Sequence, residues 1–191
     1  MHHLNAQGIP AGEQNRAGLV HRIDKNTSGL LVIAKNEQAH ARLAKQFFDH
    51  TIQRRYVALV WGNFEQDEGT ITGNIGRSPR ERQKMYVFAD GSDGKHAVTH
   101  WKVLRRYGYV TLVECRLETG RTHQIRVHMA YLGHPILGDT VYGAKKAVPG
   151  LTGQCLHAVG LQFIHPRTKE LVSLTCGLPD EFTAMLRKID R

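Results

Sequence analysis

The chain has 191 residues, with 26 lysines and arginines against 17 acidic residues and a formal net charge of +9. This length suits one domain with its own core, and a hydrophobic fraction of 41% without any apolar run of membrane-spanning length excludes a membrane-embedded chain. The positive charge favours a polyanionic partner, although a solvated basic face explains the charge equally well. Three cysteines, widely spaced and odd in number, make a disulfide framework improbable, so we expect a reduced cytoplasmic setting. The first residues contain no apolar signal core, so nothing argues for export.

The N-terminal segment predicts a loop and two short β-type runs. Residues 1–18 are polar and rich in glycine and are expected to form a loop. Leu19–Asp24 is a short β-type run, and the turn residues Lys25–Gly29 follow it. The continuous apolar run Leu30–Ala34 is typical of a buried strand.

Three helices are predicted. The first covers Glu37–Asp49, with Asn36 as its N-cap. Its apolar residues recur at a spacing of four, and this stripe, widened by Ala44 and Phe48, is expected to face the core. The two further helices are His123–Leu132, capped by Thr122, and a last helix that starts at Pro179 and ends at Ile189.

The remaining segments are rich in β-formers and are separated by turns that contain glycine and aspartate. Strands that follow strands, with few helices between them, favour an α+β fold with a mostly antiparallel sheet over a doubly wound parallel fold. The predicted strands are Arg54–Trp61, Thr70–Ile75, Lys84–Phe88, Thr99–Arg105, Val110–Leu117, Leu156–Ile164 and Leu171–Cys176.

Asp24 is the first candidate for chemistry. It ends a β-type run, with Arg22 two residues before it and a turn after it. A carboxylate at a strand end suits catalysis because the scaffold fixes it at a surface. An ordinary turn aspartate that caps the backbone at Asn26 or Thr27 would have the same local sequence, so the residue alone leaves both interpretations open.

The segment Gly120–Met129 is the second candidate. It places two arginines and two histidines at a strand-to-helix junction, where free amide groups favour an anion. His123 and Arg126 are three residues apart, so a helix would present them on one face. We predict an anionic site, for phosphate or for a carboxylate of the protein itself; a basic surface helix is the alternative.

Together these two segments resemble the signatures of the RluA-type pseudouridine synthases, in particular the branch acting on large-subunit ribosomal RNA. His21–Lys35 is similar to the family's H-R-L-D-x-x-T-S-G-L-L-V-x-A-K motif, with Ile23 in place of the usual leucine, and Gly120–His128 to its G-R-T-H-Q-I-R-V-H motif. The resemblance runs from Val20 to Pro179. Its lesser blocks are Arg55–Ala58, which resembles the tyrosine motif, Leu132–Asp139 and Leu156–Ala158.

The resemblance implies the pseudouridine synthase fold with a catalytic cleft. It also implies conversion of uridine in RNA to pseudouridine, with no cofactor and no metal. Ribosomal RNA is the expected substrate and transfer RNA its rival. Asp24 would be the catalytic carboxylate and Arg126 its partner, while Tyr56 would pack against the flipped base and could transfer a proton. Arg22 would hold the position that the base vacates. Attack of the aspartate on C1′, attack on C6, and deprotonation at C2′ to give a glycal all remain open.

A second set of residues is predicted to bind RNA. The set comprises Thr27, Arg121, His123, Arg77, Arg80, Arg82 and Lys84. The last four of these cluster between two predicted strands, and for them a solvated loop is the alternative. None of the twelve histidines lies at metal-ligand spacing with a cysteine, so no metal site is predicted.

Family members usually carry an N-K-P-x-G-type strand, and often an S4 RNA-binding module, ahead of the aspartate motif. Only 18 residues precede Leu19 here. We therefore expect 19–191 to be the catalytic domain, without an S4 domain, and 1–18 to be a loop or the remnant of a truncated N-terminal part. We also expect a monomer. The alternatives are a non-catalytic RNA-binding module, an inactive fragment of such an enzyme, and a metal-dependent nuclease, which would need clustered carboxylates.

Overall fold

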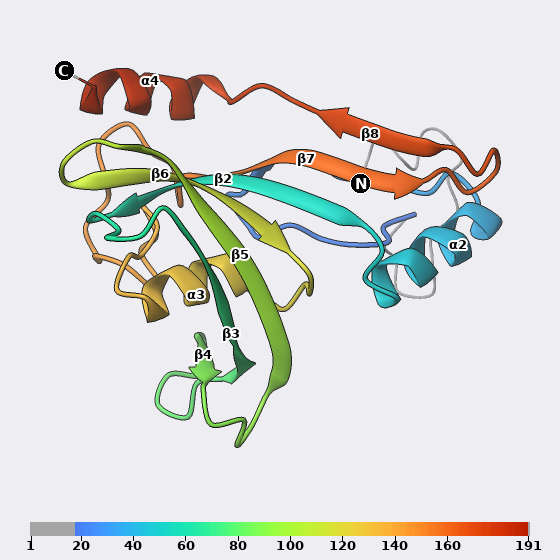
Figure 1. The fold of residues 1–191 in the computed structure, drawn as a ribbon, viewed down its shortest axis with the longest axis horizontal. Helices are drawn as coiled ribbons and strands as arrows, with labels where there is room; N and C mark the ends of the chain where they lie inside the picture. The colour runs from blue at the N-terminus through green and yellow to red at the C-terminus, as the bar shows by residue number, and fades with distance from the viewer. Residues whose placement is uncertain (1–17, 191) are drawn as a thin grey trace.

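Within residues 18–190 the strands form one mixed sheet of eight (Figure 1). The computed structural model describes residues 18–190, so the loop predicted over 1–18 lies outside the described residues except for Gly18. The strands are β1 (Ser28–Gly29), β2 (Gln53–Trp61), β3 (Glu68–Arg77), β4 (Met85–Phe88), β5 (Lys95–Arg106), β6 (Val110–Leu117), β7 (Leu156–Ile164) and β8 (Leu171–Thr175).

The sheet has the strand order β1-β7-β2-β6-β5-β3-β4. β8 also pairs with β7, so β1 and β8 occupy different halves of the same β7 edge. The β1–β7 ladder is parallel, and every other ladder between these strands is antiparallel. This arrangement confirms the predicted α+β class and the mostly antiparallel sheet.

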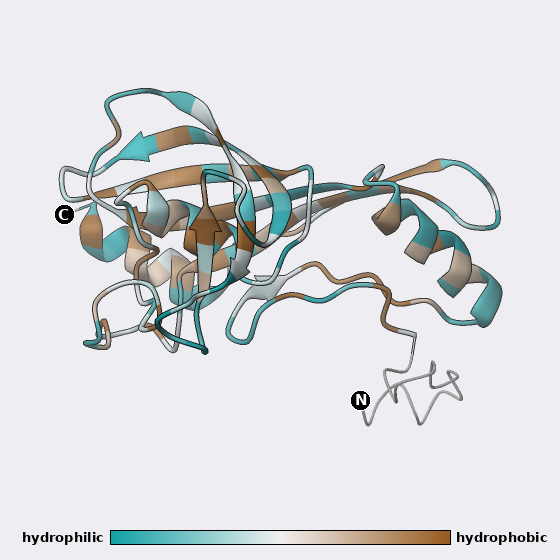
Figure 2. Ribbon diagram, turned by 90° about the horizontal axis from the view of Figure 1, so that it is seen from below, coloured by the Kyte–Doolittle hydropathy of each residue, from teal (hydrophilic) through white to brown (hydrophobic). Residues whose placement is uncertain are grey.

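The helices are α2 (Glu37–Phe48), α3 (Gln124–Tyr131) and α4 (Asp180–Ile189). Figure 2 shows α2 standing well away from α3 and α4. The predicted N-cap of α2 is confirmed, because the Asn36 side chain accepts a hydrogen bond from the Ala39 amide at 2.8 Å. Pro179 is the N-cap of α4 and immediately precedes it.

The main core lies between the central strands β2, β5 and β6 and the helices α3 and α4. Ile125 and Met129 are fully buried in it and Leu132 packs against it, so the predicted apolar face of α3 is confirmed. Val127 and His128 are buried as well, which makes α3 an interior helix and rules out the basic surface helix. A second, smaller cluster packs α2 against the end of β7.

The two predicted N-terminal strands are wrong. Leu19–Asp24 and Leu30–Ala34 form only one isolated bridge with each other, between Leu19 and Ile33. Val20, Leu30, Val32 and Ala34 from these runs pack in the α2 cluster instead, and Leu31 is exposed. The physical reason is that β7 already has both halves of its free edge paired with β1 and β8, so the apolar run finds burial without a ladder.

Two further local predictions are wrong. Phe48 is 83% exposed, because it follows Phe47 by 100° around the helix and so leaves the buried stripe. Thr122 does not cap α3. The N-cap is His123, in the left-handed region with φ 56°, and its side chain makes no capping bond. The Gln124 side chain accepts from the Arg121 amide at 2.9 Å and so ties the loop before α3 to its first turn.

Candidate active site

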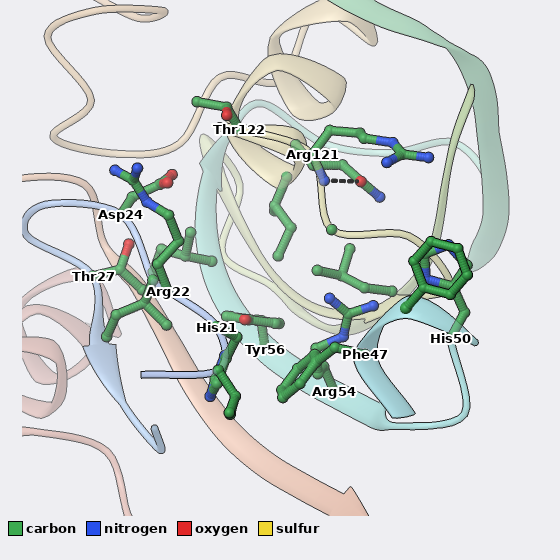
Figure 3. Close-up of a pocket in the computed structure, with 18 residues that line it drawn as sticks. His21, Arg22, Asp24, Thr27, Phe47, His50, Arg54, Tyr56, Arg121 and Thr122 are labelled. Atoms are coloured by element: carbon green, nitrogen blue, oxygen red, sulfur yellow. Dashed lines mark hydrogen bonds between the residues drawn. The ribbon is translucent and has the colours of Figure 1, made fainter. Parts of the chain in front are cut away.

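A cleft of about 550 Å³ opens between the segment before β1, the start of β2 and the loop before α3. Figure 3 shows Arg22, Asp24 and Thr27 at one end and Phe47, His50 and Arg54 at the other. The first group contains the predicted catalytic aspartate.

The backbone around Asp24 is held by a turn and a short ladder. The Thr27 amide donates to the Asp24 carbonyl at 3.0 Å. The side chain of Gln154 donates to the Lys25 carbonyl at 2.6 Å and to the Thr27 hydroxyl at 3.0 Å. Ser28 and Gly29 then pair with β7. Since the turn is closed by the backbone of Asp24, its carboxylate is available to the cleft.

Arg126 approaches Asp24 from α3. Its Nη1 lies 3.6 Å from Asp24 Oδ2, with exposed side-chain fractions of 6% for the arginine and 17% for the aspartate. The two residues are 102 positions apart in the sequence, and the structure brings them together as predicted. The predicted anionic site of the Gly120–Met129 segment therefore holds a carboxylate of the protein itself.

Asp139 is the stronger partner of Arg126. The guanidinium donates from Nε to Asp139 Oδ2 at 2.7 Å and from Nη2 to Oδ1 at 3.0 Å, and the Asp139 side chain has no solvent exposure. The same carboxylate accepts from the Val141 and Tyr142 amides. Sequence reasoning did not assign Asp139 a role; its place at the end of the Leu132–Asp139 block was the only signal.

In this pair, Arg126 stabilises the ionised form of Asp139 and Asp139 stabilises the ionised form of Arg126. Burial raises the pKa of Asp139, but the hydrogen bond and charge of Arg126 outweigh it and hold that pKa below its usual range. Burial lowers the pKa of Arg126, and the bonds and charge of Asp139 more than compensate, so that its pKa is raised. Both groups are ionised at neutral pH.

Tyr142 connects this pair to its surroundings. The Arg126 guanidinium carbon lies 5.2 Å from the Tyr142 ring centroid, a cation–π contact. The Tyr142 hydroxyl accepts from the Met85 amide at 2.8 Å and bonds His123 Nδ1 at 2.8 Å. Burial, followed by the charge of Arg126, lowers the pKa of His123. Tyr142 was not predicted either.

Tyr56 lines the cleft from β2 and is 8% exposed. Burial raises the pKa of its hydroxyl; the charge of Arg54 opposes this shift and the charge of Asp24 adds to it. The phenol is therefore neutral at pH 7. The residue is both part of the core and part of the cleft wall.

The predicted RNA-binding residues divide into two places. Arg22, Thr27 and Arg121 line the cleft, and Arg121 Nε donates to the His96 carbonyl at 2.8 Å. His123 is outside the cleft lining and bonds Tyr142. The remaining four, Arg77, Arg80, Arg82 and Lys84, lie in or next to the β3–β4 hairpin, away from the cleft lining.

No group of three or more histidine, cysteine, aspartate or glutamate side chains among residues 18–190 is placed to hold a metal ion. No helix within the described part of the chain is long and apolar enough to cross a membrane.

Comparison with known proteins places the chain among relatives. A family model described as RNA pseudouridylate synthase matches residues 1–131. An uncharacterized RNA pseudouridine synthase of Bacillus subtilis is 51% identical over 174 residues, which cover 91% of this chain and 56% of the relative. The ribosomal large subunit pseudouridine synthase D of Zymomonas mobilis is 45% identical over 99% of this chain and 61% of its own length.

Solved structures agree with these relatives. The human RNA pseudouridylate synthase domain containing 4 superposes with a TM-score of 0.74 at 26% identity, covering 92% of this chain and 78% of the human one. The human RNA pseudouridylate synthase domain containing 1 superposes with a TM-score of 0.72 at 27% identity, covering 90% of this chain and 79% of the human one. The chain spans 56% and 61% of the two curated relatives above. The sequence match and the shared fold together show that this chain belongs to the RNA pseudouridylate synthase family.

Proposed function

We propose that this chain is the catalytic domain of an RNA pseudouridine synthase that isomerises uridine in large-subunit ribosomal RNA. One observation carries the proposal: Asp24 lines a cleft of about 550 Å³, large enough for one nucleotide, and its carboxylate lies 3.6 Å from the Arg126 guanidinium, which comes from α3 behind the cleft wall. The name of the Zymomonas mobilis relative supports ribosomal RNA as the substrate. We propose a monomer that acts in the cytoplasm.

The cleft explains why the nucleotide must leave its helix. A uridine within a stack cannot present C1′ or C6 to a carboxylate, so it is flipped out at a cost of a few kcal/mol. Arg22 is exposed at the rim, on the Asp24 side of the cleft (Figure 3), where it can occupy the vacated position. Tyr56 offers its ring as a flat wall for the base.

The reaction exchanges one bond for another. The N1–C1′ bond breaks, the uracil rotates while it stays in the cleft, and C5 bonds to C1′. The proton on C5 leaves and N1 gains one, so atoms balance without a co-reactant. Asp24, whose carboxylate lies 3.6 Å from the Arg126 guanidinium, is the group that acts on the nucleotide. The neutral Tyr56 phenol can donate a proton or relay it.

The decisive test is Asp24→Asn. Pseudouridine has the same mass as uridine, so it is detected by carbodiimide labelling and primer extension on ribosomal RNA. We expect no pseudouridine with the variant and normal conversion with Asp49→Asn, which removes an exposed carboxylate paired with Lys45 on α2. Conversion by Asp24→Asn would contradict the proposal, and RNA binding by the wild type without any modified base would favour the non-catalytic module.

The RNA target needs a separate experiment. Mapping pseudouridines in RNA from cells that lack the gene should show missing sites in large-subunit ribosomal RNA. Missing sites confined to transfer RNA would overturn the ribosomal assignment and leave the isomerase chemistry intact.

A further inference from the structure

The end of the cleft opposite Asp24 contains a buried cation for which residues 18–190 supply no counter-ion. Arg54 projects into it from β2 (Figure 3) and is 9% exposed. Among residues 18–190 no carboxylate lies within 4 Å of its guanidinium, and its Nε has no hydrogen-bond partner. The one bond that its head group makes in this range runs from Nη2 to the Glu118 carbonyl at 3.2 Å. Removing a charge from water without pairing it is unfavourable, so the site as described is incomplete.

Local packing keeps this guanidinium at the cleft. Its central carbon lies 5.9 Å from the Phe47 ring centroid. A Cβ at Gly120 would come within 2.5 Å of Arg54 Nη1, so the glycine that begins the G-R-T-H segment leaves the space that the head group occupies. Burial lowers the pKa of Arg54, which shows that the surroundings do little to compensate its charge.

The same end of the cleft carries two adjacent phenylalanines in different states. Phe47 is already engaged: it stacks on His21 with ring centroids 4.4 Å apart and planes at 21°, and it also contacts Arg54. Phe48 also lines the cleft but is 83% exposed. A large apolar ring left open at the rim of a basic cleft is a stacking surface for a base.

From these observations we propose a second nucleotide subsite, in which Arg54 binds the phosphate next to the flipped uridine and Phe48 stacks on the neighbouring base. The inference rests on the proposed function, because the occupant is the RNA whose uridine lies at Asp24. RNA fits both halves of the subsite: its phosphate supplies the missing anion and its unpaired base supplies a flat face. The subsite would favour targets whose neighbouring nucleotide is unstacked.

The test measures binding of a fluorescein-labelled RNA nonamer, eight cytidines around one central uridine, by anisotropy. We expect Phe48→Ala to weaken binding about fivefold or more, the range for loss of one stacked base. Tyr109→Ala is the matched control, since it removes a ring that is 56% exposed at the turn between β5 and β6; its binding should equal that of the wild type.

Modified RNA then locates the contacts. In the first experiment, RNAs with an abasic nucleotide on one or the other side of the uridine are bound to the wild type and to Phe48→Ala. In the second, RNAs with a neutral methylphosphonate at one or the other linkage of the uridine are bound to the wild type and to Arg54→Met. On one side, the RNA and protein changes should be non-additive: each alone weakens binding, and the second adds little. Full additivity on both sides would overturn the subsite.

Folding and function are separated by further readouts. Replacing an uncompensated buried cation by methionine is expected to leave Tm unchanged or raised, and Arg54→Lys should retain more affinity than Arg54→Met. A large fall in Tm with unchanged RNA affinity would make Arg54 purely structural. If wild-type enzyme forms pseudouridine while the nonamer measurements show additivity, the subsite fails and the proposed function stands. If no pseudouridine forms, the proposed function fails on its own readout.

Discussion

Asp139 binds both Nε and Nη2 of Arg126 and so fixes the plane and the direction of its guanidinium. Only Nη1 is left to face Asp24, at 3.6 Å. The arrangement divides the work of two carboxylates: the fully buried one orients the arginine, and the partly exposed one faces the cleft. A bidentate arginine is well suited to this task, because its planar fork fixes geometry as well as charge.

Asp139→Asn should therefore impair turnover although Asp139 does not line the cleft. The amide cannot accept both guanidinium bonds, so Nη1 is no longer held toward Asp24, and a misplacement of about 1 Å is worth about 100-fold in rate. We expect a fall in kcat of this order with a smaller change in KM. The variant should also lose about 3 kcal/mol of unfolding free energy, because a buried charge loses its partner.

Asp190→Asn is the control for this variant, since its ion pair with Arg105 is exposed. Its unfolding free energy should stay within about 0.5 kcal/mol of the wild type. Steady-state kinetics at a temperature where every variant is folded would refute the orienting role if Asp139→Asn kept the wild-type kcat.

Arg126→Met should abolish turnover with a much smaller effect on RNA affinity. The reason is that Arg126 is 5% exposed and bonded to protein carboxylates, which leaves it little access to a phosphate. Single-turnover kinetics and a binding isotherm on the same RNA separate the two effects. A loss of binding of about tenfold at an unchanged rate would show that the residue serves a phosphate instead.

Stability should fall with acid between about pH 6.5 and pH 4. Burial lowers the pKa of His128 from 6.5 to about 4, and burial followed by the charge of Arg54 lowers that of His21 to about 4. In this window the unfolded chain binds more protons than the folded chain, so the free energy of unfolding drops as pH drops. Each of the two histidines accounts for up to about 3 kcal/mol of the unfolding free energy that is lost across this window.

Urea unfolding at a series of pH values measures this slope. His128→Gln, which cannot titrate, should flatten the curve relative to the wild type. Ser173→Ala removes an exposed hydroxyl on β8 that accepts from Gln162 and does not titrate, so it should leave the slope as it is. An unchanged slope in His128→Gln would contradict the burial argument.

Arg80 and Arg82 should contribute to RNA affinity through charge alone. Both are exposed next to the β3–β4 hairpin, outside the cleft lining. Each lost phosphate contact on single-stranded RNA reduces the magnitude of the slope of log K against log salt by about 0.7. The slope of the Arg80→Ala, Arg82→Ala double variant should therefore be smaller by about 1.4, and its kcat at saturating RNA should be unchanged. Arg187→Ala with Lys188→Ala, on α4, is the matched control. An unchanged slope would place both arginines in a solvated loop.

Local patterns in the sequence were sufficient for most elements. The β-rich run of β6 is found at Val110–Leu117 as predicted, and the Asn36 cap begins α2 where expected. The strand predicted over the apolar run Leu30–Ala34 is wrong, because an apolar composition indicates that a segment is buried but not that it pairs in a sheet. Whether an apolar segment joins a sheet depends on which edge is free, and β1 and β8 occupy the edge of β7.

Part of the site was also predictable from the sequence. The motif resemblance predicted that Asp24 and Arg126 are partners although they are far apart in the sequence, and the structure places them 3.6 Å apart. Asp139, Tyr142 and Arg54 were missed, because their importance lies in partners that only the folded chain supplies or withholds. A guanidinium for which the described residues supply no carboxylate, such as that of Arg54, has no signature in a linear pattern.

The turn that carries Asp24 is anchored by a strand of only two residues, Ser28 and Gly29. Gly29 has φ 111°, and a Cβ there would come within 2.3 Å of the Ala158 carbonyl, so no other residue can make this close approach without strain. So brief a ladder can detach while the rest of the sheet holds. On warming, the geometry around Asp24 is therefore expected to be lost at a lower temperature than the global fold, because β1 anchors its turn to the sheet.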